Sequence, residues 1–336
     1  MKKVKKICKF VLDDIKTNII FYIFLFVILL LNTIKLDYYI FSPGGLTPLD
    51  DRIIIENSYP EEGSFNLTYV TSRNGTLFNI LMSYIMPNWD IVDVSELRVE
   101  GESDKNANKR GQISLEQTSY DAIIAAFDAA GKEYEIKSLD LVVTYIYDIA
   151  ETNLKVGDVI KKINGVEVSD MISLHNEIDK NNKNDEIKIT IERDGKTREC
   201  KAILKDSNGQ KIIGVLISVL KDVVTNPKVE YIFKKTESGS SRGLMCALEI
   251  YNKITEEDLT KGRVIAGTGV IYEDGSVGEI DGIKYKLKGA VKHKAEIFIV
   301  PEKNYEEAEK LVKKNNYKIK LIKANNLKDV IEELKK

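Results

Sequence analysis

Residues 237–254 read ESGSSRGLMCALEIYNKI, a serine-rich polar loop followed by a helix with a stripe of apolar residues. A strand is predicted just before it, over 229–233, so Ser241 lies at the end of a strand-to-helix turn. At a helix start, free backbone N–H groups and the positive end of the helix dipole can stabilise an oxyanion. Serine is also a common helix N-cap, and this segment alone favours that simpler interpretation over a nucleophile.

A lysine on the next predicted helix, over 283–295, makes a nucleophilic role for Ser241 more plausible than a purely capping role. Lys286 is out of phase with the other lysines, and its neighbours at i+3 and i+4, Gly289 and Ala290, are small enough for another backbone to approach. We therefore expect Lys286 to point inward, where burial lowers its pKa and lets it act as a general base. A serine paired with such a lysine is a known variant of the catalytic triad. The other lysines form one solvated face: Lys284, Lys288 and Lys292.

The stretch over 140–205 alternates strand patterns with Asn-Gly and Asp-Gly turns. Its segment LKVGDVIKKINGVEV, residues 154–168, predicts a strand over 159–163 and a tight turn at Asn164-Gly165. Ser169 is expected to cap a helix that follows. These residues resemble a bacterial PDZ domain, which binds an extended peptide at a sheet edge beside a helix. The alternative is that this domain acts only as a spacer.

The serine loop and the lysine helix together resemble the proteolytic domain of Lon proteases, most closely the membrane-anchored, PDZ-containing Lon-like proteases of Gram-positive bacteria. Gly239-Ser240-Ser241-Arg242-Gly243 corresponds to the family motif Gly-Pro-Ser-Ala-Gly, and residues 282–286 to its Gly-x-x-x-Lys element. Thr268-Gly269 matches the family's strand motif. The resemblance implies a serine endopeptidase in which Ser241 is the nucleophile, Lys286 the base and Thr268 a hydrogen-bond partner of the lysine.

Two residues depart from the family motif. Ser240 replaces its proline, which would loosen the loop, and Arg242 replaces its alanine, which would hinder substrates or favour acidic ones. Ser238 and Ser240 are rival nucleophiles, and Ser241 is preferred because Gly243 follows at the required spacing. The altered motif supports a different function, a membrane-anchored peptide-binding scaffold with an inactive protease fold. A Ser/Lys amidase that acts on cell-wall peptides is a third alternative.

An apolar run near the N-terminus, IIFYIFLFVILLLNTI over Ile19–Ile34, predicts a transmembrane signal anchor over 19–36. Lysines precede the run, and this predicts a cytoplasmic N-terminus with the remaining domains outside the cytoplasm. A cleaved signal peptide is the rival interpretation, but no Ala-x-Ala site follows the run. The expected partners are therefore membrane-attached or secreted peptides and proteins. Lon-like domains often assemble as rings, so the resemblance also allows a homo-oligomer.

The composition excludes several other classes of function. The formal net charge of −2 gives no reason to expect nucleic-acid binding. The three cysteines, which include Cys8, are scattered, so we expect neither a disulfide framework nor a metal site. With only two histidines, His175 and His293, both expected at the surface, a Ser-His-Asp triad is not indicated. Gly195-Lys196-Thr197 lacks the remaining residues of a phosphate loop, so we expect no nucleotide, no cofactor and no ATP requirement.

The fold class predicted is α+β, with a Lon-type proteolytic domain and a PDZ domain that we expect to be inserted within it. The alternative is three domains in a row. Before the PDZ segment we expect a juxtamembrane linker that contains SPGGLTP, a strand from Phe65, an exposed polar stretch over 100–112 and a helix over Ser119–Ala130. The predicted boundaries are a basic tail over 1–18, the anchor over 19–36, an extracytoplasmic segment over 37–130, the PDZ domain over 131–207 and the proteolytic domain over 208–336.

Overall fold

The protein is described here by a computed structural model, which covers residues 13–96, 98–99, 101–234 and 237–336. The chain forms two compact units. Unit 1 comprises Met1–Pro43 and Val70–Val99, and unit 2 comprises Gly44–Tyr69 and Glu100–Lys336. Most of the predicted basic tail, with Cys8, lies outside the described residues.

Unit 1 is built around the first part of strand β1 and the second part of strand β3. Strand β1 pairs antiparallel with β4, with Tyr38 opposite Asp93. The Thr76 side chain accepts a hydrogen bond from the Asn79 N–H and so caps helix α3. The elements of this unit are α2 (Ile19–Thr33), β1 (Lys35–Pro48), β3 (Ser64–Thr76), α3 (Leu77–Ser83), β4 (Asp90–Asp93) and the 3-10 helix η1 (Val94–Glu96).

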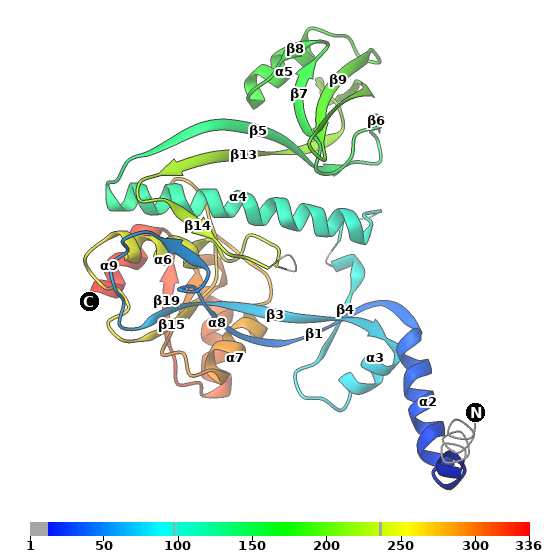
Figure 1. Cartoon of the computed structure of the whole chain (residues 1–336), viewed down its shortest axis with the longest axis vertical. Helices are drawn as coiled ribbons and strands as arrows, with labels where there is room; N and C mark the ends of the chain where they lie inside the picture. Colours follow the sequence, from blue (N-terminus) through cyan, green and yellow to red (C-terminus); the bar gives the residue numbers. More distant parts are fainter. Residues whose placement is uncertain (1–12, 97, 100, 235–236) are drawn as a thin grey trace, which may run out of the picture. The chain divides into compact units, whose positions relative to one another are not determined.

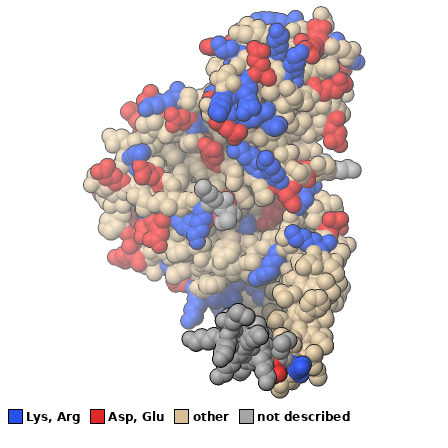
Figure 2. All heavy atoms as spheres, turned by 45° about the vertical axis from the view of Figure 1, so that its right-hand side comes forward, with Lys and Arg blue, Asp and Glu red and all other residues tan. Residues whose placement is uncertain are grey.

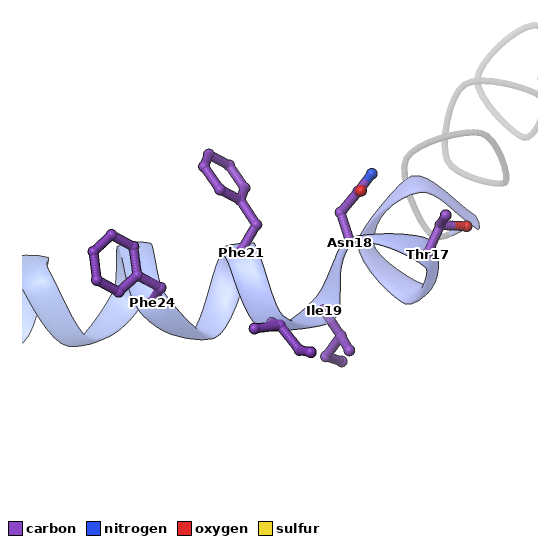
Figure 3. Close-up of a pocket in the computed structure, with 6 residues that line it drawn as sticks. Thr17, Asn18, Ile19, Phe21 and Phe24 are labelled. Atoms are coloured by element: carbon purple, nitrogen blue, oxygen red, sulfur yellow. The ribbon is translucent and has the colours of Figure 1, made fainter.

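Helix α2 is shorter than the anchor predicted over 19–36, because it ends at Thr33 and β1 starts at Lys35. In the part of the chain that the structure describes, no helix is both long and apolar enough to cross a membrane. Phe21 and Phe24 project away from α2 (Figure 3) and line a hollow without any titratable side chain. On the upper part of the face drawn in Figure 2, side chains of both charge signs are interspersed.

Unit 2 contains a sheet of parallel strands in the order β19-β18-β15-β3. Alternate residues of these strands enter two separate cores, as the period of two in a strand requires. Ile265 packs into one core and Ala266 into the other. Parallel sheets are normally covered on both faces, and this one is no exception. Besides β3, the parallel strands of this sheet are β15 (Val264–Gly267), β18 (Ile297–Pro301) and β19 (Lys320–Ala324).

Helices cover the two faces of this sheet (Figure 1). The first core is closed by α4 (Asp104–Ala130), α6 (Gly243–Ile254) and α9 (Leu327–Lys335). The second core is closed by α7 (Ile283–Lys292) and α8 (Glu302–Asn315). Phe65 of β3, Phe127 of α4 and Leu248 of α6 all lie in the first core. Residues on either side of the PDZ-like segment thus share one core.

Helix α4 is longer than the sequence predicted. It begins at Asp104 rather than near Ser119, so the polar stretch over 100–112 is largely helical, while most of its described residues are exposed as predicted. Ser103 is its N-cap and accepts a hydrogen bond from the Asn106 N–H. Arg110 holds Glu102 with two hydrogen bonds, of 2.9 and 2.7 Å. The first half of α4 is therefore fixed by capping and ion pairing rather than by an apolar stripe.

The predicted juxtamembrane linker is also wrong in part, because SPGGLTP belongs to β1. A side chain at Gly44 would lie 2.2 Å from the Tyr69 carbonyl oxygen. Glycine is needed here for the close approach of two strands and not for a turn. The glycine-containing composition of SPGGLTP, which predicted a linker, instead allows β1 to pack closely against a neighbouring strand.

The PDZ-like segment forms a second, seven-stranded sheet in the order β13-β5-β7-β9-β10-β6, with β8 paired to β7. Helix α5 (Met171–Asp179) packs on it, and Asp170 rather than the predicted Ser169 is the N-cap, in a capping box with Ser173. The strands are β5 (Tyr134–Ile146), β6 (Glu151–Thr152), β7 (Val159–Ile163), β8 (Val166–Glu167), β9 (Glu186–Arg193), β10 (Lys196–Ile203) and β13 (Val215–Thr225).

Strands β5 and β13 form a long antiparallel ribbon that joins this sheet to the rest of unit 2. The ribbon runs along α4, which lies between it and α6 (Figure 1). The sheet thus extends to Thr225, beyond the boundary predicted at 207. Three further pairs of short strands complete the fold: β2 (Ile53–Ile55) with β14 (Val229–Tyr231), β11 (Lys205–Ser207) with β12 (Gln210–Ile212), and β16 (Val270–Ile271) with β17 (Val277–Gly278).

Candidate active site

The loop before α6 carries Ser241 and is held by α4. Gly239 has a φ of +89°, a left-handed conformation that glycine adopts without strain. Its N–H donates to the Gly111 carbonyl at 2.9 Å. Further along α4, the Thr118 hydroxyl donates to the Ser240 carbonyl at 3.2 Å. The serine loop is therefore held to α4 by two hydrogen bonds, one from the Gly239 N–H and one to the Ser240 carbonyl.

Helix α6 begins at Gly243, two residues after Ser241. A β-carbon at Gly243 would lie 2.4 Å from the Thr118 hydroxyl oxygen and 3.0 Å from the Ile271 backbone nitrogen. No larger residue fits there without moving backbone. The glycine that closes the motif is therefore required by the packing of α6 against α4 and β16.

Lys286 of α7 points inward, and this prediction is confirmed: only 5% of the residue is exposed. Its neighbour Gly289 packs against the Gly44 backbone, where an added β-carbon would lie 3.2 Å from the carbonyl oxygen. Burial lowers the pKa of the Lys286 ammonium to about 8, although the nearby Asp281 carboxylate opposes the shift. A substantial fraction of this lysine is therefore neutral near pH 8.

Thr268 connects the lysine to the serine loop. The Lys286 Nζ donates to the Thr268 hydroxyl at 3.1 Å, and that hydroxyl donates to the Ser241 carbonyl at 2.9 Å. The Gly269 N–H also donates to the Ser241 carbonyl, at 2.9 Å. Within the described residues no hydrogen bond joins the Ser241 hydroxyl directly to Lys286. Such bonds often tighten only when a substrate is bound.

The first two amides of α6 are already occupied. The Gly243 N–H donates to the Ser240 carbonyl, and the Leu244 N–H donates to the Gly269 carbonyl, both at 3.1 Å. The free amides at this helix start therefore lie just before Gly243. In the described part of the chain, the N–H groups of Ser241 and Arg242 have no hydrogen-bond acceptor. These two amides are the ones available to a developing oxyanion.

Arg242 does not present a free positive charge. Its guanidinium forms an ion pair with Glu237 at 3.1 Å and lies over the Phe233 ring, 4.4 Å from the centroid. Glu237 also pairs with Arg52, at 2.9 Å. Because the side chain is packed and partly neutralised, it contributes to the stability of the loop as well as to its charge.

The PDZ-like sheet carries a groove between α5 and the start of β13. Leu174 and Ile178 are among its lining residues, and both are buried. An edge strand next to a helix is the arrangement with which PDZ domains add a peptide to a sheet. The groove is lined by Met171, Leu174, His175, Ile178, Lys211, Ile212, Ile213, Val215, Leu216 and Ile217.

The structure brings Ser241, Lys286 and Thr268 together, with Gly239 and Gly243 shaping the loop. The contribution of α4 was not predicted: its Gly111 and Thr118 contact the loop from a distant part of the chain. No local pattern indicates such a contact. The remaining cysteines are buried and form no disulfide: Cys200 and Cys246.

Two family models match parts of unit 2. Residues 235–336 match the Lon protease (S16) C-terminal proteolytic domain, and residues 117–204 match the PDZ domain. These matches indicate a serine peptidase with a peptide-binding domain. The PDZ match begins within α4 and ends before β13, which pairs with β5. A search of curated proteins finds no match.

Two solved structures from Listeria are similar to the PDZ segment. One is the PDZ domain of an SdrC-like protein from Listeria monocytogenes, with 22% identity, 23% of this chain and 85% of that chain covered, and a TM-score of 0.21. The other is the second domain of a Listeria protein, with 21% identity, 25% and 85% covered, and a TM-score of 0.20. Both TM-scores are too low for the likeness to add to the assignment.

Proposed function

We propose that the chain is an ATP-independent endopeptidase with Ser241 as nucleophile and Lys286 as general base. Neutral Lys286 takes the Ser241 proton, and the serine oxygen attacks a peptide carbonyl carbon. The N–H groups of Ser241 and Arg242 stabilise the oxyanion that forms. Protonated Lys286 then gives its proton to the leaving amine, and water releases the acyl group by the reverse sequence.

The observation that carries this proposal is the buried lysine joined to the serine loop through Thr268. A buried lysine with its pKa lowered to about 8 matches the task of a general base. Thr268 orients the ammonium toward the loop and is a positioning residue. The test is to incubate the full chain with an unstructured protein, without ATP, and to identify products by mass spectrometry. Absence of any cleavage would contradict the proposal.

The rate of cleavage is expected to rise with pH through the pKa of Lys286. Because the neutral amine is the active form, kcat/KM should increase about tenfold per pH unit below a pKa of about 8 and level off above it. A short peptide substrate, assayed across this range, gives the profile. Asp281→Asn should move the midpoint to lower pH, since the Asp281 carboxylate favours the ammonium. A profile that is flat through this range would contradict the role of Lys286.

We also propose that the PDZ domain is inserted within the protease fold. Strand β3 and helix α4 precede the PDZ segment, yet β3 pairs with β15 and α4 packs on α6. Both form part of the first core together with residues that follow the PDZ segment. A fragment of residues 208–336 would lack these elements, so it should not fold cooperatively. A sharp unfolding transition of that fragment would support three domains in a row.

The groove between α5 and β13 is expected to bind peptide substrates. Met171→Glu places a charge in the groove and should weaken peptide binding about tenfold or more. The variant loses an apolar contact with the peptide, and the new carboxylate must be desolvated when the peptide binds. Ile172→Glu is the matched control, because Ile172 is 73% exposed and does not line the groove. Binding is measured by fluorescence anisotropy with a labelled peptide. Equal loss in both variants would argue against this groove.

The cellular location is a prediction from the sequence. The lysines ahead of the apolar run over Ile19–Ile34 favour a membrane-attached protein with its peptidase outside the cytoplasm. The substrates would then be membrane-attached or secreted peptides and proteins. Assembly into a homo-oligomeric ring is a second prediction, based on the resemblance to Lon-like domains. Protease accessibility in intact cells tests the location, since an enzyme inside the cytoplasm would be protected.

A further inference from the structure

Three carboxylates meet beside α6, away from the serine loop, where the sequence predicted no metal site. One ligand oxygen from each of Asp50, Glu61 and Glu249 lies within 4.8 Å of the other two. They come from the segment after β1, the segment before β3 and the middle of α6. The cluster therefore joins three parts of unit 2 that are separate in the chain.

Glu249 is the observation that points to a ligand. The residue is fully buried, and neither of its carboxylate oxygens accepts a hydrogen bond from any residue that the structure describes. Buried carboxylates are normally paired and hydrogen-bonded, because an uncompensated charge in the interior is costly. The protein alone thus leaves this side chain poorly satisfied.

Lys253 compensates only part of the negative charge. Its ammonium lies 3.3 Å from a Glu249 oxygen, but its shorter contacts are to Asp50 at 2.7 Å and the Ile53 carbonyl at 2.8 Å. One ammonium therefore accompanies a cluster of three carboxylates. The Ile53 carbonyl gives Lys253 a contact that it can keep if another cation occupies the cluster.

We infer that Asp50, Glu61 and Glu249 form a binding site for a divalent cation, and that the cation is Ca²⁺. Calcium takes oxygen ligands at about 2.3–2.6 Å, so opposite ligands are separated by up to about 5 Å. The spacing of these carboxylates falls within that limit. Magnesium holds its ligands at about 2.0–2.1 Å in a strict octahedron, to which carboxylates on three separate segments of the chain are less readily fitted. Bound calcium satisfies Glu249 and ties α6 to the segments that hold Asp50 and Glu61.

The test is the response of the full chain to Ca²⁺ alone. After treatment with a chelator, the protein is titrated with CaCl2 by calorimetry, and its melting temperature is followed as calcium is added. We expect one bound Ca²⁺ per chain and a melting temperature that rises with calcium concentration. No calcium binding, or an equal response to MgCl2, would overturn the inference.

Three variants separate a metal site from a merely acidic surface. Glu249→Gln should lower calcium affinity on the order of tenfold or more, because it removes a charged ligand. Glu61→Gln should also weaken binding. Glu256→Gln is the control, since Glu256 is exposed beyond the end of α6 and is not among the ligands. Equal calcium affinity in Glu249→Gln and Glu256→Gln would overturn the site.

The calcium-free protein should show the opposite effect on stability. Without calcium, Glu249→Gln should raise the melting temperature, because it removes a buried carboxylate that the single ammonium of Lys253 compensates only in part. With calcium present the order of the two melting temperatures should reverse. A variant that is less stable than the parent both with and without calcium would contradict the inference. None of these outcomes depends on peptidase activity.

Discussion

Replacing Ser241 by alanine is expected to reduce peptide cleavage at least about 1,000-fold, because the acyl intermediate forms on the serine oxygen. The bonds that hold this residue in place are made by its carbonyl, which alanine retains and which accepts from Thr268 and Gly269. The variant should therefore fold and melt like the parent. The measurement is kcat/KM on a peptide substrate, together with a thermal melt.

Ser238→Ala and Ser240→Ala are the controls for this experiment. Both serines lie in the same loop, and the contacts of Ser240 described above are made by its backbone carbonyl. These variants should keep most of the activity and should still react with a serine-directed covalent probe. Loss of labelling in Ser240→Ala, with labelling retained in Ser241→Ala, would move the nucleophile to Ser240. No labelling of the parent would favour the peptide-binding scaffold.

Replacing Lys286 by methionine is expected to abolish cleavage to a similar degree while stabilising the fold. Methionine fills a similar volume without the ammonium, whose burial lowers the pKa to about 8 from an ordinary value of 10.5. The lowered pKa means that the folded state disfavours the charged form, a penalty present in full below pH 8. At pH 7 the free energy of unfolding of the variant should thus exceed that of the parent by about 1–3 kcal/mol.

The sign of this effect can be checked against pH. The penalty declines as pH rises from about 8 toward 10.5, so the stability difference between Lys286→Met and the parent should shrink over that window. Lys292→Met, on the exposed side of the same helix, should change neither activity nor stability by much. Denaturant unfolding at several pH values provides the measurement. If Lys286→Met were less stable than the parent at pH 7, the buried Lys286 ammonium would not destabilise the fold, and the prediction would be wrong.

Features that depend on local pattern could be predicted from the sequence. Lys286 could be singled out because it breaks the spacing of the other lysines on α7, and its burial follows from that phase. The turns and alternating isoleucines of the PDZ segment predicted its strands for a similar reason. In each case the signal lies within a few residues of the feature.

Features that depend on distant partners were not predictable in this way. The segment SPGGLTP was predicted to be a linker because of its glycines and prolines. Gly44 is needed there because the Tyr69 backbone packs against it, and Tyr69 is distant in sequence. The sequence of the first half of α4 predicts only an exposed polar stretch, because no apolar stripe marks it as helical, although Ser103 is a residue type typical of a helix N-cap. The contact of Thr118 with Ser240 joins residues that are far apart in sequence, and no periodicity records it.

The shared core of α4 and α6 has a consequence for the order of events during synthesis. Translation proceeds from the N-terminus, so α4 leaves the ribosome before the whole PDZ sheet, and α6 leaves it after. Until α6 arrives, Ile123 and Phe127 of α4 have no partner helix to cover them. The PDZ sheet has its own core and can fold during this interval. A chain whose synthesis stops between the two helices therefore exposes an apolar helix face, which a chaperone can recognise, and holds no assembled serine loop.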